Sequence, residues 1–217
     1  LYLSVLEAMD LQLGIMFDYV KSHPELHDNT LIIICSDNGP EKGAGRATPF
    51  RGFKTHLYEG GIRSPLIVWG PSMMEKSMVG TRNKDSVFSA IDLVPSLIRL
   101  TGSGNPMAQA YDGEEVLDTL LGKSRQSRKE PIFFSRPPDR KNFYGFKNLP
   151  DLAMRQGKWK LLCDYDGGRP ELYDISSDPG ETNNLAQEQL GTAQELADKV
   201  VSWHRTMPHM QDSDDSN

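Results

Sequence analysis

The sequence has few cysteines, no long apolar run and no block of basic residues. Its two cysteines, Cys35 and Cys163, have neither the spacing of a metal site nor the number that a disulfide framework needs. The longest nearly continuous apolar runs, residues 31–35 and 65–69, are far shorter than the roughly 18 residues of a membrane-spanning helix. The net charge is −6. We therefore expect no membrane span and no general nucleic-acid binding, and we expect any anionic ligand to be bound locally.

Length and composition are those of a folded chain. The 217 residues, of which 37% are hydrophobic, predict one large domain or one medium domain with a small appendage. The sequence begins with Leu1 rather than Met, inside a segment of helical periodicity, and carries no pattern of a secretory signal. These features predict a piece of a longer protein.

The first half of the sequence combines helix and strand patterns. Between residues 2 and 21, apolar residues recur mostly at spacings of three and four, which predicts an amphipathic helix that ends before Pro24. Residues 31–35 and 65–69 are continuous apolar runs, typical of strands in a parallel sheet covered by helices. A glycine-rich loop, 38–62, lies between them. This order predicts an α/β fold.

The second half predicts helices and a separate small sheet. Residues 89–100 indicate a helix with Pro95 at a kink or in its first turn, and residues 114–121 indicate a short helix. Four short segments predict an antiparallel sheet, and they are residues 132–134, 153–155, 159–162 and 171–173. A closing helix is expected over residues 181–204.

We predict three parts along the chain. Residues 1–125 belong to an α/β domain, residues 126–210 form a small subdomain of antiparallel sheet and packed helix, and residues 211–217 form a disordered tail. No internal repeat is evident.

Two oxygen donors follow the first predicted strand. Asp37 and Asn38 come just after the predicted strand at residues 31–35, and ligands of open α/β sheets bind at the carboxyl ends of strands. A carboxylate and an amide oxygen suit Ca²⁺ or Mg²⁺, although two ligands are fewer than the six to eight oxygens that Ca²⁺ takes. The alternative is a plain turn, since Asn-Gly is a strong turn dipeptide.

The loop that follows is basic although the chain is acidic. Between Glu41 and Arg63 there are five basic residues against two acidic ones. Glycine-rich backbone with local positive charge is suited to a tetrahedral anion. A solvated basic loop is the alternative.

Three motifs stand out in this region, and they are Ser36-Asp37-Asn38-Gly39, Arg51-Gly52-Phe53-Lys54 and Glu59-Gly60-Gly61-Ile62-Arg63-Ser64-Pro65. In this order and spacing they resemble the second half of a sulfatase, the formylglycine-dependent branch of the alkaline phosphatase superfamily. The resemblance continues through Asp92-Leu93-Val94-Pro95-Ser96-Leu97, Asp112-Gly113, Trp159-Lys160-Leu161 and Glu171-Leu172-Tyr173-Asp174. It implies the C-terminal part of an alkaline-phosphatase-like α/β sandwich, followed by the small sheet subdomain.

The resemblance implies roles for particular residues. Asp37 and Asn38 would complete a site for Ca²⁺ or Mg²⁺, and Lys54 would contact the sulfate and stabilise its charge as a catalytic residue. His56 is a candidate for contact with the substrate, against the alternative of a surface histidine. Glu59 and Arg63 are expected to be architectural, with their charges pairing.

The resemblance also implies what lies outside this sequence. The family's cysteine, which becomes the formylglycine nucleophile, stands in a motif that neither Cys35 nor Cys163 matches. We therefore expect that nucleophile in a missing N-terminal half, with this chain inactive alone. A sulfated small molecule or glycan is the expected substrate, and a secreted or periplasmic location is expected by resemblance alone. Partnership with the missing half, or self-association, is also expected.

Two other functions stay open at this stage. One is hydrolysis of phosphate or phosphonate esters within the same superfamily, whose metal ligands overlap. The other is a non-catalytic fragment that binds a sulfated ligand.

Overall fold

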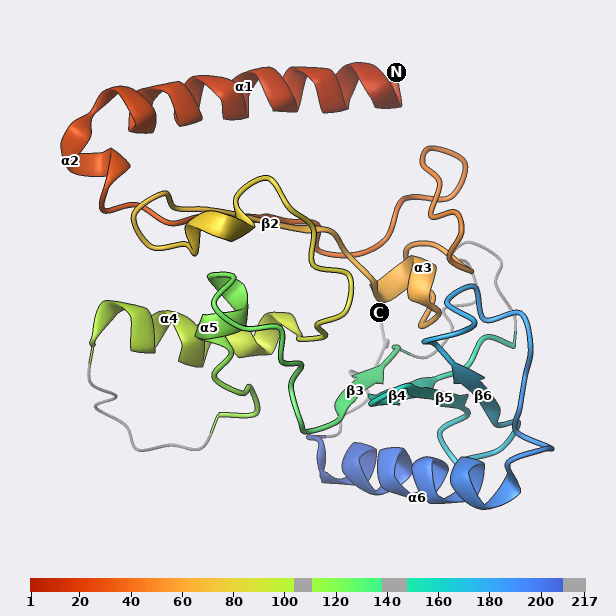
Figure 1. Cartoon of the computed structure of the whole chain (residues 1–217). Coiled ribbons are helices and arrows are strands. Elements are labelled where there is room, and N and C mark those ends of the chain that lie inside the picture. The colour runs from red at the N-terminus through yellow and green to blue at the C-terminus, as the bar shows by residue number, and fades with distance from the viewer. Residues whose placement is uncertain (104–110, 138–147, 209–217) are drawn as a thin grey trace, which may run out of the picture. The chain divides into compact units, whose positions relative to one another are not determined.

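The computed structural model describes residues 1–103, 111–137 and 148–208. The chain forms two compact units (Figure 1): Leu1–Asp37 with Ser64–Glu130, and Asn38–Arg63 with Pro131–Asn217. The predicted division into residues 1–125 and 126–210 stays a prediction. The expected tail at 211–217 lies outside the described residues. No helix in the described ranges is long and apolar enough to cross a membrane.

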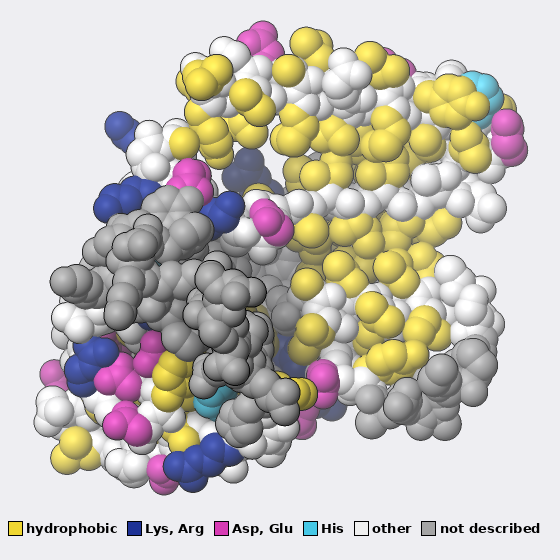
Figure 2. All heavy atoms as spheres, turned by 180° about the vertical axis from the view of Figure 1, so that it is seen from behind, with side chains coloured by type: hydrophobic (Ala, Val, Ile, Leu, Met, Phe, Trp, Pro, Cys, Tyr) yellow, Lys and Arg dark blue, Asp and Glu magenta, His cyan; other side chains and the backbone are white. Residues whose placement is uncertain are grey.

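The first unit opens with two helices, α1 (Tyr2–Ser22) and α2 (Pro24–His27). The predicted first helix is confirmed, and it ends because His23 takes an extended backbone before Pro24. Only Val20 of α1 is buried. Figure 2 shows apolar side chains gathered along this helix, and Leu3 and Met9 are 78% and 52% exposed.

A two-stranded sheet follows α2 in the first unit. β1 (Ile32–Cys35) pairs with β2 (Leu66–Trp69), and Ile33 lies opposite Val68 in an antiparallel register. The expected parallel arrangement is wrong for this pair, because the intervening loop returns the chain in the opposite direction. Trp69 contacts Phe17 of α1 edge-on, with ring centroids 5.6 Å apart.

Short helices complete the first unit. They are the 3₁₀ turns η1 (Lys76–Met78) and η2 (Ala90–Asp92), and the α-helices α4 (Leu93–Thr101) and α5 (Leu117–Leu120). Pro95 lies in the first turn of α4, as predicted, and Gly102 ends the helix in the left-handed conformation (φ 64°). α5 is shorter than the predicted helix.

Asp92 organises the region around α4. Its fully buried carboxylate accepts hydrogen bonds from the backbone N–H groups of Ser89 and Glu114, each at 2.7 Å. Arg128, which is also buried, donates to the same carboxylate at 2.7 Å. The charge of Asp92 is therefore fully compensated inside the unit.

The second unit is built on the predicted antiparallel sheet. Its strands are β3 (Ile132–Ser135), β4 (Leu152–Gln156), β5 (Trp159–Cys163) and β6 (Glu171–Asp174). They pair in sequential order, all antiparallel. The turn between β4 and β5 uses Gly157 at φ 57°, a conformation that glycine adopts without steric cost.

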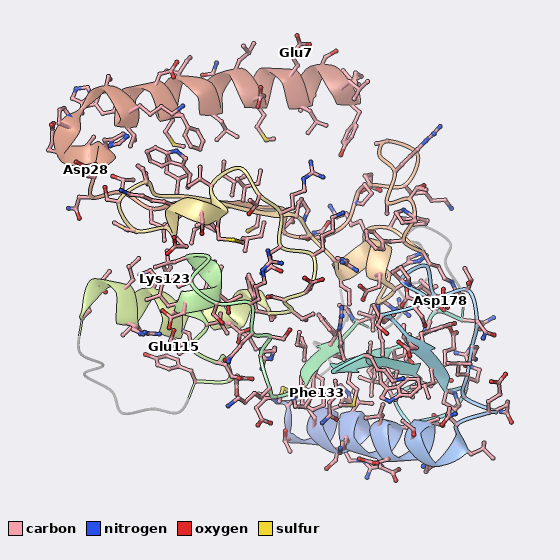
Figure 3. The ribbon with its side chains drawn as sticks, in the orientation of Figure 1. Glu7, Asp28, Glu115, Lys123, Phe133 and Asp178 are labelled. Carbon is pink, nitrogen blue, oxygen red and sulfur yellow. The ribbon has the colours of Figure 1, made fainter. Side chains whose placement is uncertain are left out.

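The closing helix, α6 (Leu190–Thr206), packs on this sheet. Leu196 and Val200 bury its apolar side against Leu161 and other residues of β4 and β5. Phe133 of β3, labelled in Figure 3, lies on the side of the sheet that faces α6. It stacks on Trp203 of α6 with ring centroids 5.0 Å apart.

The predicted start of that helix at residue 181 is wrong. Glu181 has a left-handed backbone (φ 54°) and its side chain is buried in the interior of the unit. The segment that follows borders β6 instead, because the Leu185 N–H donates to the Leu172 carbonyl at 2.8 Å. A long-range side-chain contact therefore displaces the helix start by nine positions relative to the sequence pattern.

Candidate functional site

The two predicted metal ligands follow β1. Asp37 is exposed and is the last residue of the first unit, and Asn38 is half-buried and begins the second. Their carboxylate and amide oxygens match a hard divalent cation in chemistry. Among the described residues, no group of three or more His, Cys, Asp or Glu side chains could hold a metal ion. Asp37 and Asn38 therefore stay predicted ligands, two of the larger set that such a cation takes.

Backbone hydrogen bonds bring the three motifs of the loop 38–63 together. The Lys54 N–H donates to the Pro40 carbonyl at 3.0 Å, which places the Arg-Gly-x-Lys motif beside the segment that carries Asn38. The Gly39 N–H donates to the Gly61 carbonyl at 2.8 Å. These bonds link the Ser-Asp-Asn-Gly motif to both of the motifs that follow it.

The Glu-Gly-Gly motif forms a short helix, α3 (Glu59–Ile62). Its glycines permit the backbone segments around it to come into direct contact with the helix. A Cβ on Gly60 would lie 2.4 Å from the Arg51 carbonyl oxygen, and one on Gly61 would lie 2.0 Å from the His56 carbonyl oxygen. Both separations are too short for any side chain. The predicted pairing of Glu59 with Arg63 is confirmed at 3.5 Å.

Lys54 presents its ammonium at the surface of this loop. The side chain is 46% exposed, and Nζ lies 3.8 Å from the Glu41 carboxylate. A half-exposed ion pair of this length contributes little to stability. The ammonium is therefore open to an anion from solvent.

His56 is half-buried rather than a plain surface residue. Its ring lies against Phe53, with centroids 4.2 Å apart, and edge-on to Tyr58 at 6.1 Å. Burial, reinforced by the positive charges of Arg136 and Arg51, lowers the pKa of the imidazole. The ring is therefore neutral at pH 7, and its predicted role in substrate contact stays a prediction.

Arg51 is basic but structurally committed. Its guanidinium lies over the Tyr58 ring at 3.8 Å and donates to the Tyr173 hydroxyl at 2.8 Å. It also pairs with Glu171 of β6 at 3.3 Å. These contacts hold the Arg-Gly-x-Lys motif against the sheet of the second unit.

A buried charge cluster lies beneath α3 and was not anticipated from the sequence. Lys160 of β5 is fully buried, with Nζ 3.0 Å from Glu59 and 2.8 Å from Glu181. Arg155 of β4 lies 3.5 Å from the other Glu59 oxygen. The signal in the sequence was a lysine inside an apolar strand, where a charge is found only when it is paired.

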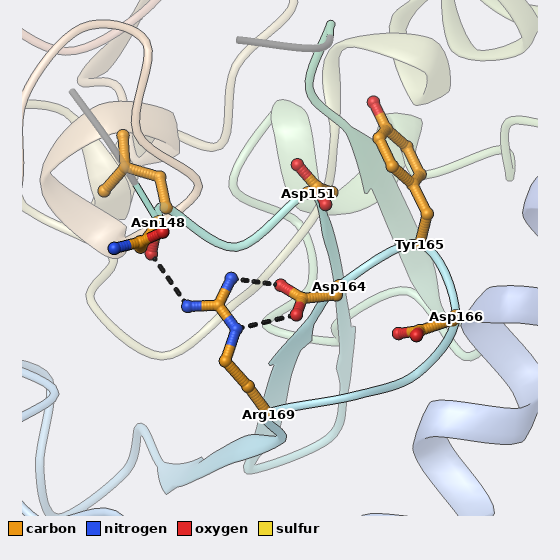
Figure 4. A pocket seen from close by; sticks show the side chains of 7 residues that line it. Asn148, Asp151, Asp164, Tyr165, Asp166 and Arg169 are labelled. Carbon is orange, nitrogen blue, oxygen red and sulfur yellow. Dashed lines mark hydrogen bonds and ion pairs between the residues drawn. The ribbon is translucent and has the colours of Figure 1, made fainter. Parts of the chain in front are cut away.

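A separate polar pocket lies elsewhere in the second unit (Figure 4). Its volume is about 400 Å³. Arg169 crosses it and pairs with Asp164 through two hydrogen bonds of 2.7 and 2.5 Å, and it also donates to the Asn148 carbonyl at 3.2 Å. None of the predicted site residues lines this pocket.

Known proteins with similar sequences are sulfatases. The sequence model of the Sulfatase family matches residues 1–103. An N-acetylgalactosamine-6-O-sulfatase of Bacteroides thetaiotaomicron is 32% identical over 206 residues, which cover 82% of this chain and 37% of that protein. Human arylsulfatase A is 28% identical, with 79% and 36% covered. The chain thus spans about a third of the length of these curated relatives.

Solved structures agree with these relatives. A sulfatase structure from work on glycosaminoglycan metabolism by Bacteroides thetaiotaomicron matches with a TM-score of 0.72 and 29% identity, over 91% of this chain and 43% of that one. The crystal structure of Ps i-CgsB matches with a TM-score of 0.74 and 27% identity, over 91% and 41%.

The fold shows the structural class to which this chain belongs. It is the alkaline-phosphatase-like α/β fold of sulfatase structures, with its small antiparallel sheet, as the sequence predicted. The sequence matches then identify the family, and the chain belongs to the sulfatases.

Proposed function

We propose that this chain is part of a sulfatase that hydrolyses sulfate esters. In this proposal Lys54 contacts the sulfate, and Asp37 and Asn38 supply two ligands to a divalent cation, Ca²⁺ or Mg²⁺. The observation that carries the proposal is the hydrogen bond from the Lys54 N–H to the Pro40 carbonyl at 3.0 Å. It joins the lysine motif to the segment of the predicted metal ligands, which lie 16 and 17 positions before Lys54 in the sequence.

The residues of the chain suit the charge that develops in this reaction. Hydrolysis breaks the ester link between sulfur and the substrate oxygen, and it yields an alcohol or phenol, sulfate and a proton. A bound cation supplies charge neutralisation at the sulfate oxygens. Lys54 adds a positive charge on the same anion, and its half-exposed ammonium is open to solvent. The nucleophile, a formylglycine by resemblance, comes from outside this chain.

A sulfated sugar is the substrate class that we propose. The 32% identical relative is named an N-acetylgalactosamine-6-O-sulfatase, and Ps i-CgsB has been solved in complex with k-i-k-neocarrahexaose. Support for this class comes from those names and from the polar, basic character of the loop 38–63.

The direct test is sulfate release by the complete protein that contains this chain. Substrates are N-acetylgalactosamine 6-sulfate and 4-nitrophenyl sulfate, with 4-nitrophenyl phosphate to detect a phosphoesterase. We expect Lys54→Ala to lower kcat/KM for sulfate esters by about 10²–10³, as loss of one charge-stabilising donor does. Lys123→Ala, at an exposed lysine of the first unit outside the three motifs, is the control. Faster turnover of the phosphate ester, or no turnover of any ester, would refute the proposal.

Metal dependence is tested on the same protein. We expect chelation to abolish sulfate release and added Ca²⁺ or Mg²⁺ to restore it. Asp37→Ala is expected to raise the cation concentration that restores half of the activity. Unchanged activity after exhaustive chelation would contradict the assigned ligands.

The exposed apolar side of α1 supports a partner for the first unit. Leu3, Met9 and Met16 are 78%, 52% and 41% exposed, and a contiguous exposed apolar patch on a protein surface indicates a contact site. We propose that the remaining part of a sulfatase-length protein covers this helix, and that the complete protein is secreted or periplasmic. Sedimentation of the 217-residue chain is expected to show self-association that Met9→Lys reduces. A compact monomer without dye-accessible apolar surface would contradict the proposal that another part of the protein covers α1. A cytosolic location in fractionated host cells would contradict the proposed secreted or periplasmic location.

A further inference from the structure

The cluster beneath α3 places several charges where water cannot reach them. Lys160 is 0% exposed, and the side chains of its partners Glu59 and Glu181 are 2% and 0% exposed. Two carboxylates and one ammonium in the interior are costly to desolvate, and well-packed apolar residues stabilise an interior about as well. The cluster therefore calls for an explanation other than stability alone.

The cluster is connected to the loop 38–63 through α3. One Glu181 oxygen pairs with Lys160, and the other accepts a hydrogen bond from the Glu59 N–H at 2.7 Å. Glu181 thus holds both the backbone at the start of α3 and the lysine that pairs with the Glu59 side chain. The first residue of α3 is fixed by its main chain and by its side chain together.

From α3 the connection continues to both segments of the candidate site. The Gly60 N–H donates to the Arg51 carbonyl at 2.7 Å, three residues before Lys54. The Gly61 carbonyl accepts from Gly39, the residue after Asn38. A displacement of α3 would therefore be passed to Lys54 and Asn38 through tight backbone contacts that leave no room for a side chain.

The backbone next to Lys54 is strained. Thr55 has φ 80°, which is unfavourable for a β-branched residue. Within the described residues its buried hydroxyl has no hydrogen-bond partner. Conformations of this kind persist only when the surrounding structure over-determines them. The carbonyl groups of Phe53 and His56, in the segment around Thr55, lie directly against Gly61 of α3, so the packing of α3 holds this segment in place.

We propose that Lys160 and Glu181 are positioning residues, which hold Glu59 and, through α3, set the backbone that carries Lys54 and Asn38. The effect that we infer on activity rests on the proposed roles of Lys54 and Asn38. In this proposal the small antiparallel sheet supports the loop 38–63.

The first test measures amide hydrogen exchange by NMR in the 217-residue chain. In Glu181→Gln, which keeps an oxygen acceptor for the Glu59 N–H, we expect protection of the Gly39, Lys54 and Gly60 amides to fall about tenfold or more. Paired amides of β4 and β5 are expected to stay within about threefold of the parent. Lys160→Met, which leaves two carboxylates without their ammonium, is expected to have the larger effect if it folds.

Lys158→Met is the matched control. Lys158 is two positions from Lys160, is 54% exposed and pairs with Asp174 at the surface. Its loss is expected to leave the loop amides unchanged. Equal loss of protection in sheet and loop in Glu181→Gln would indicate a general stabilising role and overturn the proposal. No loss in either place would overturn it as well.

The second test is a double-mutant cycle on kcat/KM in the complete protein. If Glu181 acts in part through Lys54, the loss in the variant with both Glu181→Gln and Lys54→Ala is expected to be smaller than the product of the two single losses, and what remains acts through Asn38. Additive losses would refute action through Lys54. The exchange experiment does not depend on activity, so failure of the proposed sulfatase function and failure of the positioning role are told apart.

Discussion

Replacing Gly60 by alanine is a sensitive test of the close backbone packing around α3. An added Cβ would lie 2.4 Å from the Arg51 carbonyl oxygen and 2.5 Å from that of Gly52. Relief requires a shift of roughly half an ångström or more between two backbone segments in a close-packed region, which costs about 1–3 kcal/mol. The hydrogen bond from the Gly60 N–H to Arg51 would be lost or weakened, at about 1 kcal/mol. We expect Gly60→Ala to destabilise the second unit by about 2–4 kcal/mol.

Gly191→Ala is the matched control within the same unit. Gly191 also lies in a helix, α6, and a Cβ there meets no atom within 4 Å. This substitution is expected to raise the free energy of unfolding by about 0.5–1 kcal/mol, because alanine is preferred over glycine in a helix. The two substitutions add the same methyl group, so their opposite signs isolate the effect of close packing.

Urea unfolding followed by tryptophan fluorescence provides the measurement. Trp159 and Trp203 lie in the second unit and Trp69 in the first, so a Trp69→Phe background makes the signal specific for the second unit. The free energy of unfolding is then compared by linear extrapolation. A Gly60→Ala variant within about 0.5 kcal/mol of its parent would refute the packing argument.

Three further predictions concern other parts of the chain. Burial raises the pKa of the Cys163 thiol to about 12. A thiol reagent at pH 8 is therefore expected to label the exposed Cys35 and to reach Cys163 only after unfolding. Equal labelling of both cysteines in the folded chain would contradict this. Asp92→Ala removes the buried carboxylate that accepts from Arg128 and from the Ser89 and Glu114 N–H groups, and it is expected to cost about 3–5 kcal/mol in urea unfolding followed by circular dichroism, whereas a loss under 1 kcal/mol would count against it. Thr55→Gly relieves a positive φ and removes a buried hydroxyl, so we expect a gain of about 1 kcal/mol, and a loss of stability would show that the backbone there is not strained.

Elements set by local periodicity were predicted well. The first helix and the four strands of the small sheet lie where their apolar patterns placed them, because those patterns reflect which face of each element is buried. The errors arose where distant contacts decide. β1 and β2 read as strands of a parallel sheet but pair antiparallel, and the last helix begins at Leu190 because Glu181 is turned into the interior by Lys160 and Glu59.

The sequence by itself determined the family and the candidate residues Asp37, Asn38, Lys54 and His56, because motifs of unusual composition carry that information without a structure. Only the tertiary structure decided how the loop 38–63 is supported. Lys160 lies 101 positions from Glu59, and no local pattern shows that one buried charge is the partner of another so far away. The physical reason is that a charge in the interior needs an opposite charge within a few ångströms, and the chain meets that need by folding, whatever the separation along the sequence.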